Sequence, residues 1–363
     1  MSSRIVAVEI FSPATWLLRI APVFAEWVPE IIEGLGCETL RPLAKEYTLV
    51  RVADPDAMRG SEAWKYVGWN LRVDHAWPCN PVKMEGFIEK AARGLAARFG
   101  SGKPQRIAVG ALDAGNPYFK QLASNLRGRA LQLFPEHPSS EDADAPVLFC
   151  MVGKEGLFCG LQRAIASNGV YPGGTKYIAT GGPDSISRAG AKIAGALHYL
   201  EMHQAPLPEG SRWLELGASP GGMTAELLRC HFRVTAIDRA PLDRRLAKDR
   251  ALVFLQAGVA EYTPSPGTRF EAILCNMNGD ALASLRQVVR LSRFLTDPGL
   301  VVFTLKTPGT VSLEEMDELY RQAVGLAADQ GLRLIAGTHL PYNRQEFTLF
   351  FSSGMADRGN PLA

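Results

Sequence analysis

The second half of the chain shows a regular alternation of two hydrophobic patterns. From Ser185 onward, short apolar runs alternate with amphipathic stretches in which apolar residues recur at helical spacing. The predicted strands span 212–218, 233–238, 253–257, 271–277, 299–306, 333–341 and 346–352, and the predicted helices span 187–203, 221–230, 281–296 and 312–330. This order is typical of a doubly wound, mostly parallel α/β sheet. The last two strands are joined by a short turn, so we expect them to pair antiparallel.

The first half has a less regular α+β pattern. The predicted strands span 4–11, 47–52, 106–112, 146–152 and 156–161, and the predicted helices span 14–35, 87–99 and 118–134. We expect two small units that divide near residue 70. Residues 167–184 are rich in glycine and proline and lack periodicity, which predicts a linker.

Composition narrows the class of protein. The chain has 363 residues, of which 47% are hydrophobic and 21% charged, as in folded globular proteins. It contains no run of about 18 uncharged apolar residues, and its first residues lack the apolar region of a signal peptide. The six cysteines form no CxxC pair, so we expect reduced thiols and no metal. These features favour a cytoplasmic protein without a membrane partner.

One strand–turn–helix segment is rich in glycine. The sequence from Trp213 to Thr224 reads WLELGASPGGMT, and Asp238 ends the next predicted strand, 21 residues after Gly217. Ligands of open α/β sheets bind at the carboxyl ends of the strands, and a carboxylate at this spacing can accept hydrogen bonds from a ribose. The segment lacks the GxGxxG pattern of dinucleotide sites, which disfavours a dehydrogenase. An ordinary tight turn remains the alternative.

The segment LELGASPGG resembles the first motif of S-adenosylmethionine (SAM)-dependent methyltransferases. Its ASPGG form resembles the FtsJ-like ribose 2′-O-methyltransferases, which use a Lys-Asp-Lys-Glu tetrad. Lys192 in SRAGAK, Lys306 in LKTP and Glu346 in NRQEFT occupy the places of three tetrad members. Each residue alone is more often a solvated surface charge. The resemblance depends on all three occurring at the corresponding places beside ASPGG.

Two positions depart from that group. Asn276, in the segment ILCNM, stands where the group has the tetrad aspartate. Gly258, in QAG, stands where an acidic residue usually holds the adenine edge. An amide can accept a hydrogen bond but carries no charge, so Lys306 would be held less well, and we expect this loss to outweigh any decrease of its pKa. The activity is therefore expected to be impaired.

The whole chain resembles the large-subunit ribosomal RNA 2′-O-ribose methyltransferase M family. The resemblance implies a Rossmann-like class I SAM methyltransferase fold preceded by an α+β RNA-binding region, ferredoxin-like and then THUMP-like. It also implies ribosomal RNA as partner and a cytidine as target. The expected divisions are 1–70 ferredoxin-like, 71–166 THUMP-like, 167–184 linker, 185–355 methyltransferase and 356–363 tail.

The resemblance further implies which residues form the site. The expected catalytic residues are Lys306 as base, Lys192, Glu346 and Asn276. The expected SAM-binding residues are Ser187, Gly217, Ala218, Ser219, Pro220, Gly221, Gly222, Asp238, Gly258 and Asn276. Two alternatives stay open: a SAM- and RNA-binding protein that has lost catalysis, and a SAM-dependent enzyme with another acceptor.

Local charge indicates where RNA would bind. The net charge is only +2, but residues 229–250 contain seven basic and three acidic residues. We expect RNA to contact this cluster together with Arg163 and Lys176, across a cleft between the two halves. A solvated face is the alternative interpretation of the cluster. The sequence leaves the oligomeric state open.

Overall fold

The computed structural model describes residues 15–134, 141–174, 176, 178, 185–307, 309–310 and 312–354. The chain divides into two compact units, Met1–Lys176 and Tyr177–Ala363. The predicted strand at 4–11 and the predicted tail at 356–363 lie outside the described residues.

The first sheet of unit 1 is antiparallel and has the strand order β2-β3-β1-β4. Its elements follow the order strand, helix, strand, strand, helix, strand: β1 (Thr15–Ile20), α1 (Val28–Gly34), β2 (Cys37–Pro42), β3 (Tyr47–Val52), α2 (Pro55–Gly60) and β4 (Val67–Arg72). This element order and strand order are those of a ferredoxin-like split βαβ arrangement.

The predicted helix at 14–35 is wrong over its first part. Residues 15–20 form strand β1, which lies between β3 and β4, and a short 3-10 helix, Pro22–Trp27, precedes α1. Five of the six β1 residues are buried. A central strand covered on both faces need not alternate apolar and polar residues, so its apolar residues can imitate the spacing of a helix.

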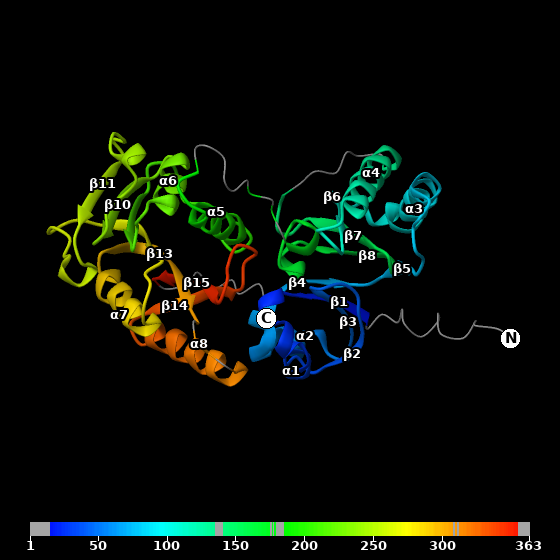
Figure 1. Ribbon diagram of the computed structural model, residues 1–363, viewed down its shortest axis with the longest axis horizontal. Coiled ribbons are helices and arrows are strands. Elements are labelled where there is room, and N and C mark those ends of the chain that lie inside the picture. The colour runs from blue at the N-terminus through cyan, green and yellow to red at the C-terminus, as the bar shows by residue number, and fades with distance from the viewer. Residues whose placement is uncertain are drawn as a thin grey trace. The chain divides into compact units, whose positions relative to one another are not determined.

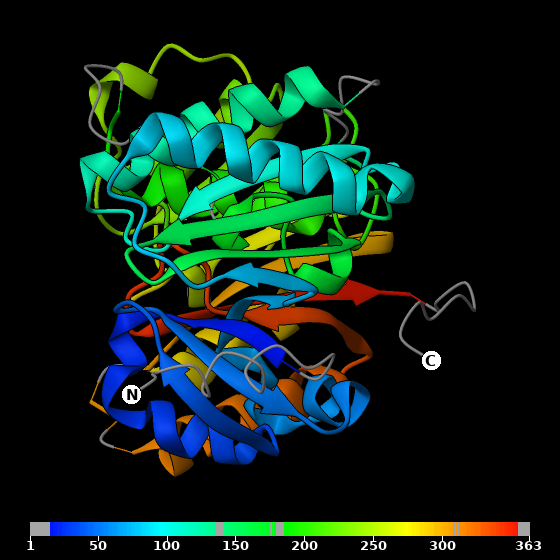
Figure 2. The ribbon, with the colours of Figure 1, turned by 90° about the vertical axis from the view of Figure 1, so that its right-hand side faces the viewer.

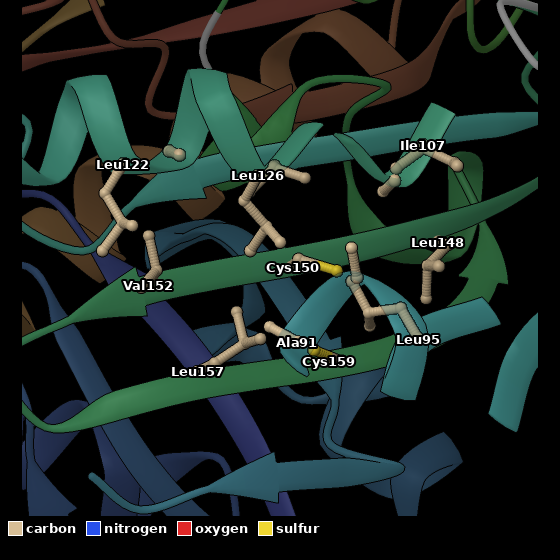
Figure 3. Packing of buried hydrophobic residues seen from close by; sticks show 14 of the residues in the cluster. Ala91, Leu95, Ile107, Leu122, Leu126, Leu148, Cys150, Val152, Leu157 and Cys159 are labelled. Carbon is tan, nitrogen blue, oxygen red and sulfur yellow. The ribbon is translucent and has the colours of Figure 1, made fainter. Parts of the chain in front are cut away.

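The second sheet of unit 1 has the order β5-β8-β7-β6. Its elements are β5 (His75–Trp77), α3 (Met84–Phe99), β6 (Arg106–Ala111), α4 (Pro117–Leu133), β7 (Pro146–Gly153) and β8 (Gly156–Arg163). Helices α3 and α4 cover one face, where Leu95 and Leu126 pack towards Cys150 and Leu157 (Figures 2 and 3). The predicted hairpin of β7 and β8 is confirmed.

The other face of this sheet shares a hydrophobic core with the first sheet. Leu17, Leu49 and Trp69 of the first sheet lie in one buried cluster with Phe149 and Phe158 of the second. The rings of Trp69 and Phe149 meet edge to face, with centroids 5.5 Å apart. The two sheets therefore form one compact unit rather than two independent ones, and the THUMP-like assignment of the second stays a prediction.

Part of the predicted linker belongs to unit 1. The Nη1 atom of Arg19 donates a hydrogen bond of 2.7 Å to the carbonyl of Gly173, and Val170 is buried in the shared core. Residues 167–174 are thus packed into unit 1 although their sequence lacks periodicity. Glycine and proline there permit close backbone approach instead of chain flexibility.

Unit 2 contains a seven-stranded sheet of order β11-β10-β9-β12-β13-β15-β14. Its strands are β9 (Arg212–Leu216), β10 (Arg233–Asp238), β11 (Leu252–Gln256), β12 (Phe270–Cys275), β13 (Leu295–Lys306), β14 (Leu332–Thr338) and β15 (Glu346–Ser353). The first five strands in sequence are parallel, and β15 is antiparallel to both of its neighbours. The predicted alternation and the antiparallel final pair are confirmed, and the fold is a Rossmann-like methyltransferase fold.

Helices cover both faces of this sheet (Figure 1). One face carries α5 (Ala189–Leu200) and α6 (Gly222–Arg229), whose apolar residues pack with Leu274, Val302 and Phe350. The opposite face carries α7 (Ala281–Ser292) and α8 (Leu313–Ala328), and Tyr320 of α8 packs edge to face on Phe347 of β15. Alternate residues of β15 therefore point to opposite helical layers.

Within the described parts of both units, no helix combines the length and the apolar character needed to cross a membrane. In the same residues, no three His, Cys, Asp or Glu side chains are grouped in a way that could hold a metal ion.

Candidate functional site

The glycine-rich loop connects β9 to α6 at the carboxyl edge of the sheet. Gly217 has a φ of 78°, and a Cβ atom there would lie 2.9 Å from the Cα of Met277. Gly221 has a φ of 107° and caps the amino terminus of α6. Only glycine combines this backbone conformation with so close an approach of the β12 loop. Ala218 between them is buried.

Asp238 fixes the loop from the end of β10. One carboxylate oxygen accepts a hydrogen bond from the backbone N–H of Ser219 at 2.9 Å, and the other accepts one from Ala240 at 2.8 Å. The loop then turns through a cis bond between Ser219 and Pro220. A carboxylate has about four acceptor positions, so Asp238 retains capacity for hydroxyl groups of a ligand.

Ser187 and Gly222 join this loop to α5. A Cβ atom on Gly222 would lie 2.0 Å from the Oγ of Ser187, so the two residues are in contact. The same Oγ accepts a hydrogen bond from the N–H of Ala189 at the start of α5. The helix that carries Lys192 is thereby placed directly beside the glycine-rich loop.

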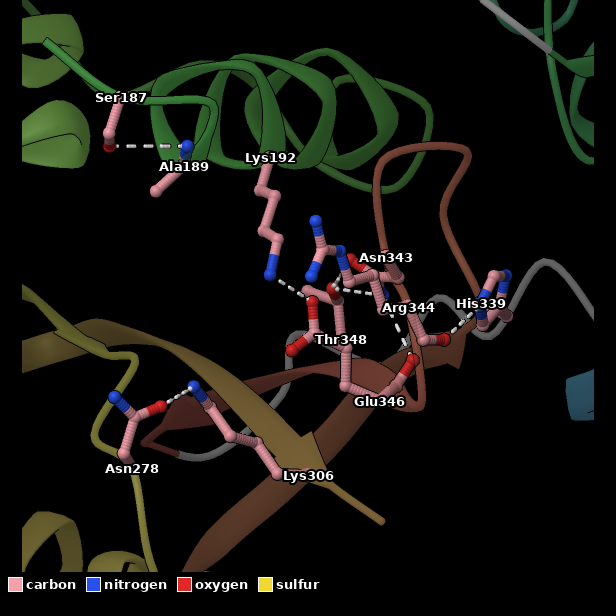
Figure 4. A network of polar contacts seen from close by, with 10 residues as sticks. All are labelled: Ser187, Ala189, Lys192, Asn278, Lys306, His339, Asn343, Arg344, Glu346 and Thr348. Carbon is pink, nitrogen blue, oxygen red and sulfur yellow. Dashed lines mark hydrogen bonds and ion pairs between the residues drawn. The ribbon is translucent and has the colours of Figure 1, made fainter. Parts of the chain in front are cut away.

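Lys192 and Glu346 form an ion pair between α5 and β15 (Figure 4). The Glu346 side chain is 6% exposed and that of Lys192 is 20% exposed. A nearly buried carboxylate needs a charged partner, because removing an isolated charge from water is costly. The structure therefore pairs Glu346 with Lys192.

Lys306 lies directly opposite Glu346 in the antiparallel pairing of β13 and β15. Directly opposed residues share one face of a sheet, so both side chains point to the α5 layer. The Lys306 amine donates a hydrogen bond of 2.6 Å to the Oδ1 of Asn278 (Figure 4). Burial, the largest cause, lowers the pKa of Lys306 below its ordinary value; Glu346 partly raises it and Lys192 lowers it.

The expected contact between Asn276 and Lys306 is not present. Asn276 follows β12, and its N–H donates to the carbonyl of Leu216 at 3.1 Å, but its buried Oδ1 has no hydrogen-bond partner. Asn278, two residues further on, holds Lys306 instead. The tetrad resemblance points to position 276 and is silent on position 278. A polar side chain within the next turn of the same loop was the available signal.

A carboxylate also lies beside Gly258. A Cβ atom on Gly258 would be 3.0 Å from an Oε1 atom of Glu261 and 3.2 Å from the Nε of Arg239. The residue at 258 itself supplies no acid, as the sequence indicates. Glu261 nevertheless brings one to the same place, three residues later in the chain, and the sequence pattern did not indicate it.

The site residues thus fall into two groups at one edge of the sheet. The loop residues 217–222, together with Ser187 and Asp238, surround the β9–α6 turn. The second group consists of two polar pairs, Lys192 with Glu346 and Lys306 with Asn278, which α5, the ends of β13 and β15, and the loop after β12 contribute (Figure 4). The orphaned buried Oδ1 of Asn276 and the cradle at Gly217 are features that a bound polar ligand would complete.

No family model matches the chain. Curated relatives are named ribosomal RNA large subunit methyltransferase M. The protein of Alkalilimnicola ehrlichii is 26% identical over 68% of this chain and 73% of its own length. That of Halorhodospira halophila is 31% identical over 48% of this chain and 49% of its own, and that of Shewanella pealeana 26% over 46% and 47%. The chain thus spans about half the length of most of these relatives, and they confirm the resemblance indicated by the motifs.

Solved structures similar to this chain include TrmN and a fibrillarin. TrmN from Thermus thermophilus matches with a TM-score of 0.36 and 16% identity, over 94% of this chain and 100% of its own. Aeropyrum pernix fibrillarin in complex with natively bound SAM matches with a TM-score of 0.34 and 16% identity, over 56% and 81%. At these scores the likeness adds nothing to the topology described above.

Glu215 provides a test of the electrostatics beneath the loop. It is buried on β9, and burial raises the pKa of its carboxyl group to about 8; a hydrogen bond from Thr224 opposes this, and the charge of Asp238 adds to it. Because the folded-state pKa lies above the unfolded value of about 4.3, stability is intact below that value and falls as the pH rises towards 8. Glu215→Gln keeps an acceptor for Thr224 and removes the ionisation.

We expect the urea concentration at the unfolding midpoint of unit 2 to decrease in the wild type when the pH is raised from 5 to 8.5. Hydrogen exchange of peptides from β9 measures this midpoint. The free energy of unfolding obtained from these curves should decrease by about 1.4 kcal/mol for each unit by which folding raises the pKa of Glu215, and Glu215→Gln should abolish the decrease. Glu314→Gln, on the exposed surface of α8, serves as a charge-matched control that retains the wild-type pH dependence. An equal decrease in both variants would contradict the assignment.

Proposed function

We propose that the chain is a SAM-dependent RNA methyltransferase that modifies a ribose 2′-hydroxyl, with a cytidine of large-subunit ribosomal RNA as its target. One observation carries the proposal: Lys192, Lys306 and Glu346 converge on one face of the sheet beside the glycine-rich loop. The names of the curated relatives support ribosomal RNA as the substrate class.

The cofactor fits the residues around the loop. Asp238 would accept hydrogen bonds from the ribose hydroxyls, and the backbone from Ser219 to Gly222 would border the methionine part. Gly258 and the neighbouring Glu261 would border the adenine, and Asn276 would direct its unpartnered oxygen to a cofactor donor. When bound, SAM supplies an electrophilic methyl group.

The chain's own residues would remove the proton from the 2′-hydroxyl and orient the ribose that accepts the methyl group. The 2′-hydroxyl is a weak acid, so a base must take its proton, and Lys306 can do so only as the neutral amine. Burial lowers the pKa of Lys306 and so increases the neutral fraction. Lys192, held by Glu346, would orient the ribose hydroxyls and keep a positive charge near Lys306. We therefore expect transfer to become faster as the pH rises through the pKa of Lys306.

Asp238→Ala tests the cofactor assignment. The substitution removes acceptors for the ribose and for Ser219, so SAM affinity should fall by ~1–3 kcal/mol, the cost of leaving buried groups unsatisfied. Isothermal titration calorimetry measures this directly. Asp329→Ala, at the exposed end of α8, should bind SAM as the wild type does. Unchanged affinity in Asp238→Ala would exclude Asp238 from the cofactor site.

Lys306→Met tests the reaction itself. Because the amine acts on the proton in the transition state, the variant should lose methyl transfer from labelled SAM to RNA while both binding affinities stay nearly intact. Lys120→Met, on the exposed surface of α4, is the matched control. Transfer at near wild-type rate in Lys306→Met would show that another group is the base. Label entering protein or DNA instead of RNA would favour a different acceptor.

The RNA surface is best supported on unit 2. Arg163 forms an ion pair with Asp144 at 3.2 Å, and Lys176 lies 5.8 Å from the ring centre of Tyr171, whose hydroxyl bonds to Glu141. Nearby acids thus offset these charges. In the 229–250 cluster, by contrast, several side chains are exposed cations for which the described residues show no acidic partner: Arg233, Arg244, Lys248 and Arg250.

Arg244→Gln with Arg250→Gln tests this surface. Removal of one cation–phosphate interaction should lower the slope of log affinity against log salt by about one, so the double variant should lower it by about two. Filter binding or fluorescence anisotropy with a ribosomal RNA fragment at several salt concentrations gives the slope. Arg286→Gln with Arg333→Gln removes two exposed charges elsewhere on unit 2 and should leave the slope unchanged. Equal slopes for both double variants would place the RNA elsewhere.

A further inference from the structure

Lys306 has a hydrogen-bond partner that neither its strand nor the tetrad resemblance supplies. Its amine donates a hydrogen bond of 2.6 Å to the side-chain oxygen of Asn278, which lies on the loop between β12 and α7. Figure 4 shows the amide of Asn278 facing the end of the Lys306 side chain. This contact is the starting point for assigning a role to Asn278 in the proposed reaction.

The loop that carries Asn278 is anchored on both sides. Before it, the N–H of Asn276 donates to the carbonyl of Leu216 on β9. After it, the carboxylate of Asp280 accepts a hydrogen bond of 2.6 Å from the N–H of Ala283 and caps α7. Only Met277 and Gly279 separate Asn278 from these two anchors. The amide therefore presents its oxygen to Lys306 from a short loop whose two ends are each held by a hydrogen bond.

The groups facing Lys306 come from four elements and only one is a carboxylate. Glu346 lies on β15, Lys192 on α5, Cys275 at the end of β12 and Asn278 on the following loop. Glu346 is engaged with Lys192. In the described part of the chain, the group that receives a hydrogen bond from the Lys306 amine is therefore neutral.

A neutral acceptor differs from a carboxylate in one respect that matters for a base. Both the ammonium and the neutral amine carry N–H groups that an amide oxygen can accept. A carboxylate in the same place would strongly favour the ammonium, because an opposite charge within about 4–6 Å stabilises the protonated form. An amide holds the nitrogen in position with little preference for its charge.

We propose that Asn278 is the positioning residue of Lys306, and that its neutral amide holds the amine in place while permitting the amine to lose its proton. The role rests on the proposed function, in which Lys306 is the base. Asn278 acts through Lys306 and needs no contact with RNA. In this proposal, Asn278 takes the role of orienting Lys306, which the resemblance assigned to residue 276.

The test measures the proton affinity of Lys306 separately from activity. Native protein is labelled with acetic anhydride at a series of pH values, and acetylation of Lys306 is quantified by peptide mass spectrometry. Asn278→Asp should move the labelling midpoint upward by about one pH unit, the lower end of the effect of an adjacent opposite charge, since residue 278 is exposed. Asn80→Asp, an exposed change of the same charge in unit 1, should leave the midpoint unchanged.

Methyl transfer provides the second readout. The pH profile of transfer should move upward with the labelling midpoint in Asn278→Asp. Asn278→Ala should reduce the rate of transfer roughly tenfold or more, because the Lys306 amine is no longer held in position. Its labelling midpoint should lie much closer to that of the wild type than to that of Asn278→Asp. An unmoved midpoint in Asn278→Asp, or wild-type transfer in Asn278→Ala, would overturn the role of Asn278. A shifted midpoint without transfer from any variant, wild type included, would support the contact and reject the proposed function.

Discussion

The antiparallel insertion of β15 between β13 and β14 is the constraint on which the candidate site depends. It places Glu346, at the first position of β15, opposite Lys306, at the last position of β13. A slip of one residue would turn Glu346 to the α7–α8 face and bring Phe347 to the site. Burial of Phe347, Leu349 and Phe351 on that other face makes such a slip costly. The core therefore fixes the position of the carboxylate.

The charges of the site follow from this placement. Glu346 is nearly buried and would be destabilising alone, and α5 brings Lys192 within ion-pair distance from the adjacent layer. Contact between Ser187 and Gly222 fixes the start of α5 against the glycine-rich loop. The loop that would border the cofactor and the lysine that would face the ribose are thus parts of one packing arrangement.

The sequence predicted unit 2 well because most of its strands are buried apolar runs separated by amphipathic helices, two of which have clear caps. Ser312 and Asp280, for example, begin α8 and α7 with side-chain hydrogen bonds. It failed at residues 15–20, where a strand covered on both faces lacks a period of two. It also failed at residue 278, because side-chain reach across a loop is set by tertiary geometry. The family motif points to residue 276, so comparison with the motif could not identify Asn278 as the partner of Lys306.

Replacement of the expected aspartate at 276 by asparagine does not by itself imply loss of catalysis. A hydrogen bond to a charged acceptor contributes about 1.5–3 kcal/mol and one to a neutral acceptor about 0.5–1.5 kcal/mol, so an amide holds the amine less tightly by roughly 1 kcal/mol. A carboxylate beside the amine would raise its pKa by at least about one unit, which is ~1.4 kcal/mol against the neutral base. The two effects are similar in size and opposite in sign. Because Asn278 accepts a hydrogen bond from Lys306, the amine is held in place without an added negative charge. Lys306 is therefore better suited to act as a base than the tetrad resemblance alone indicates.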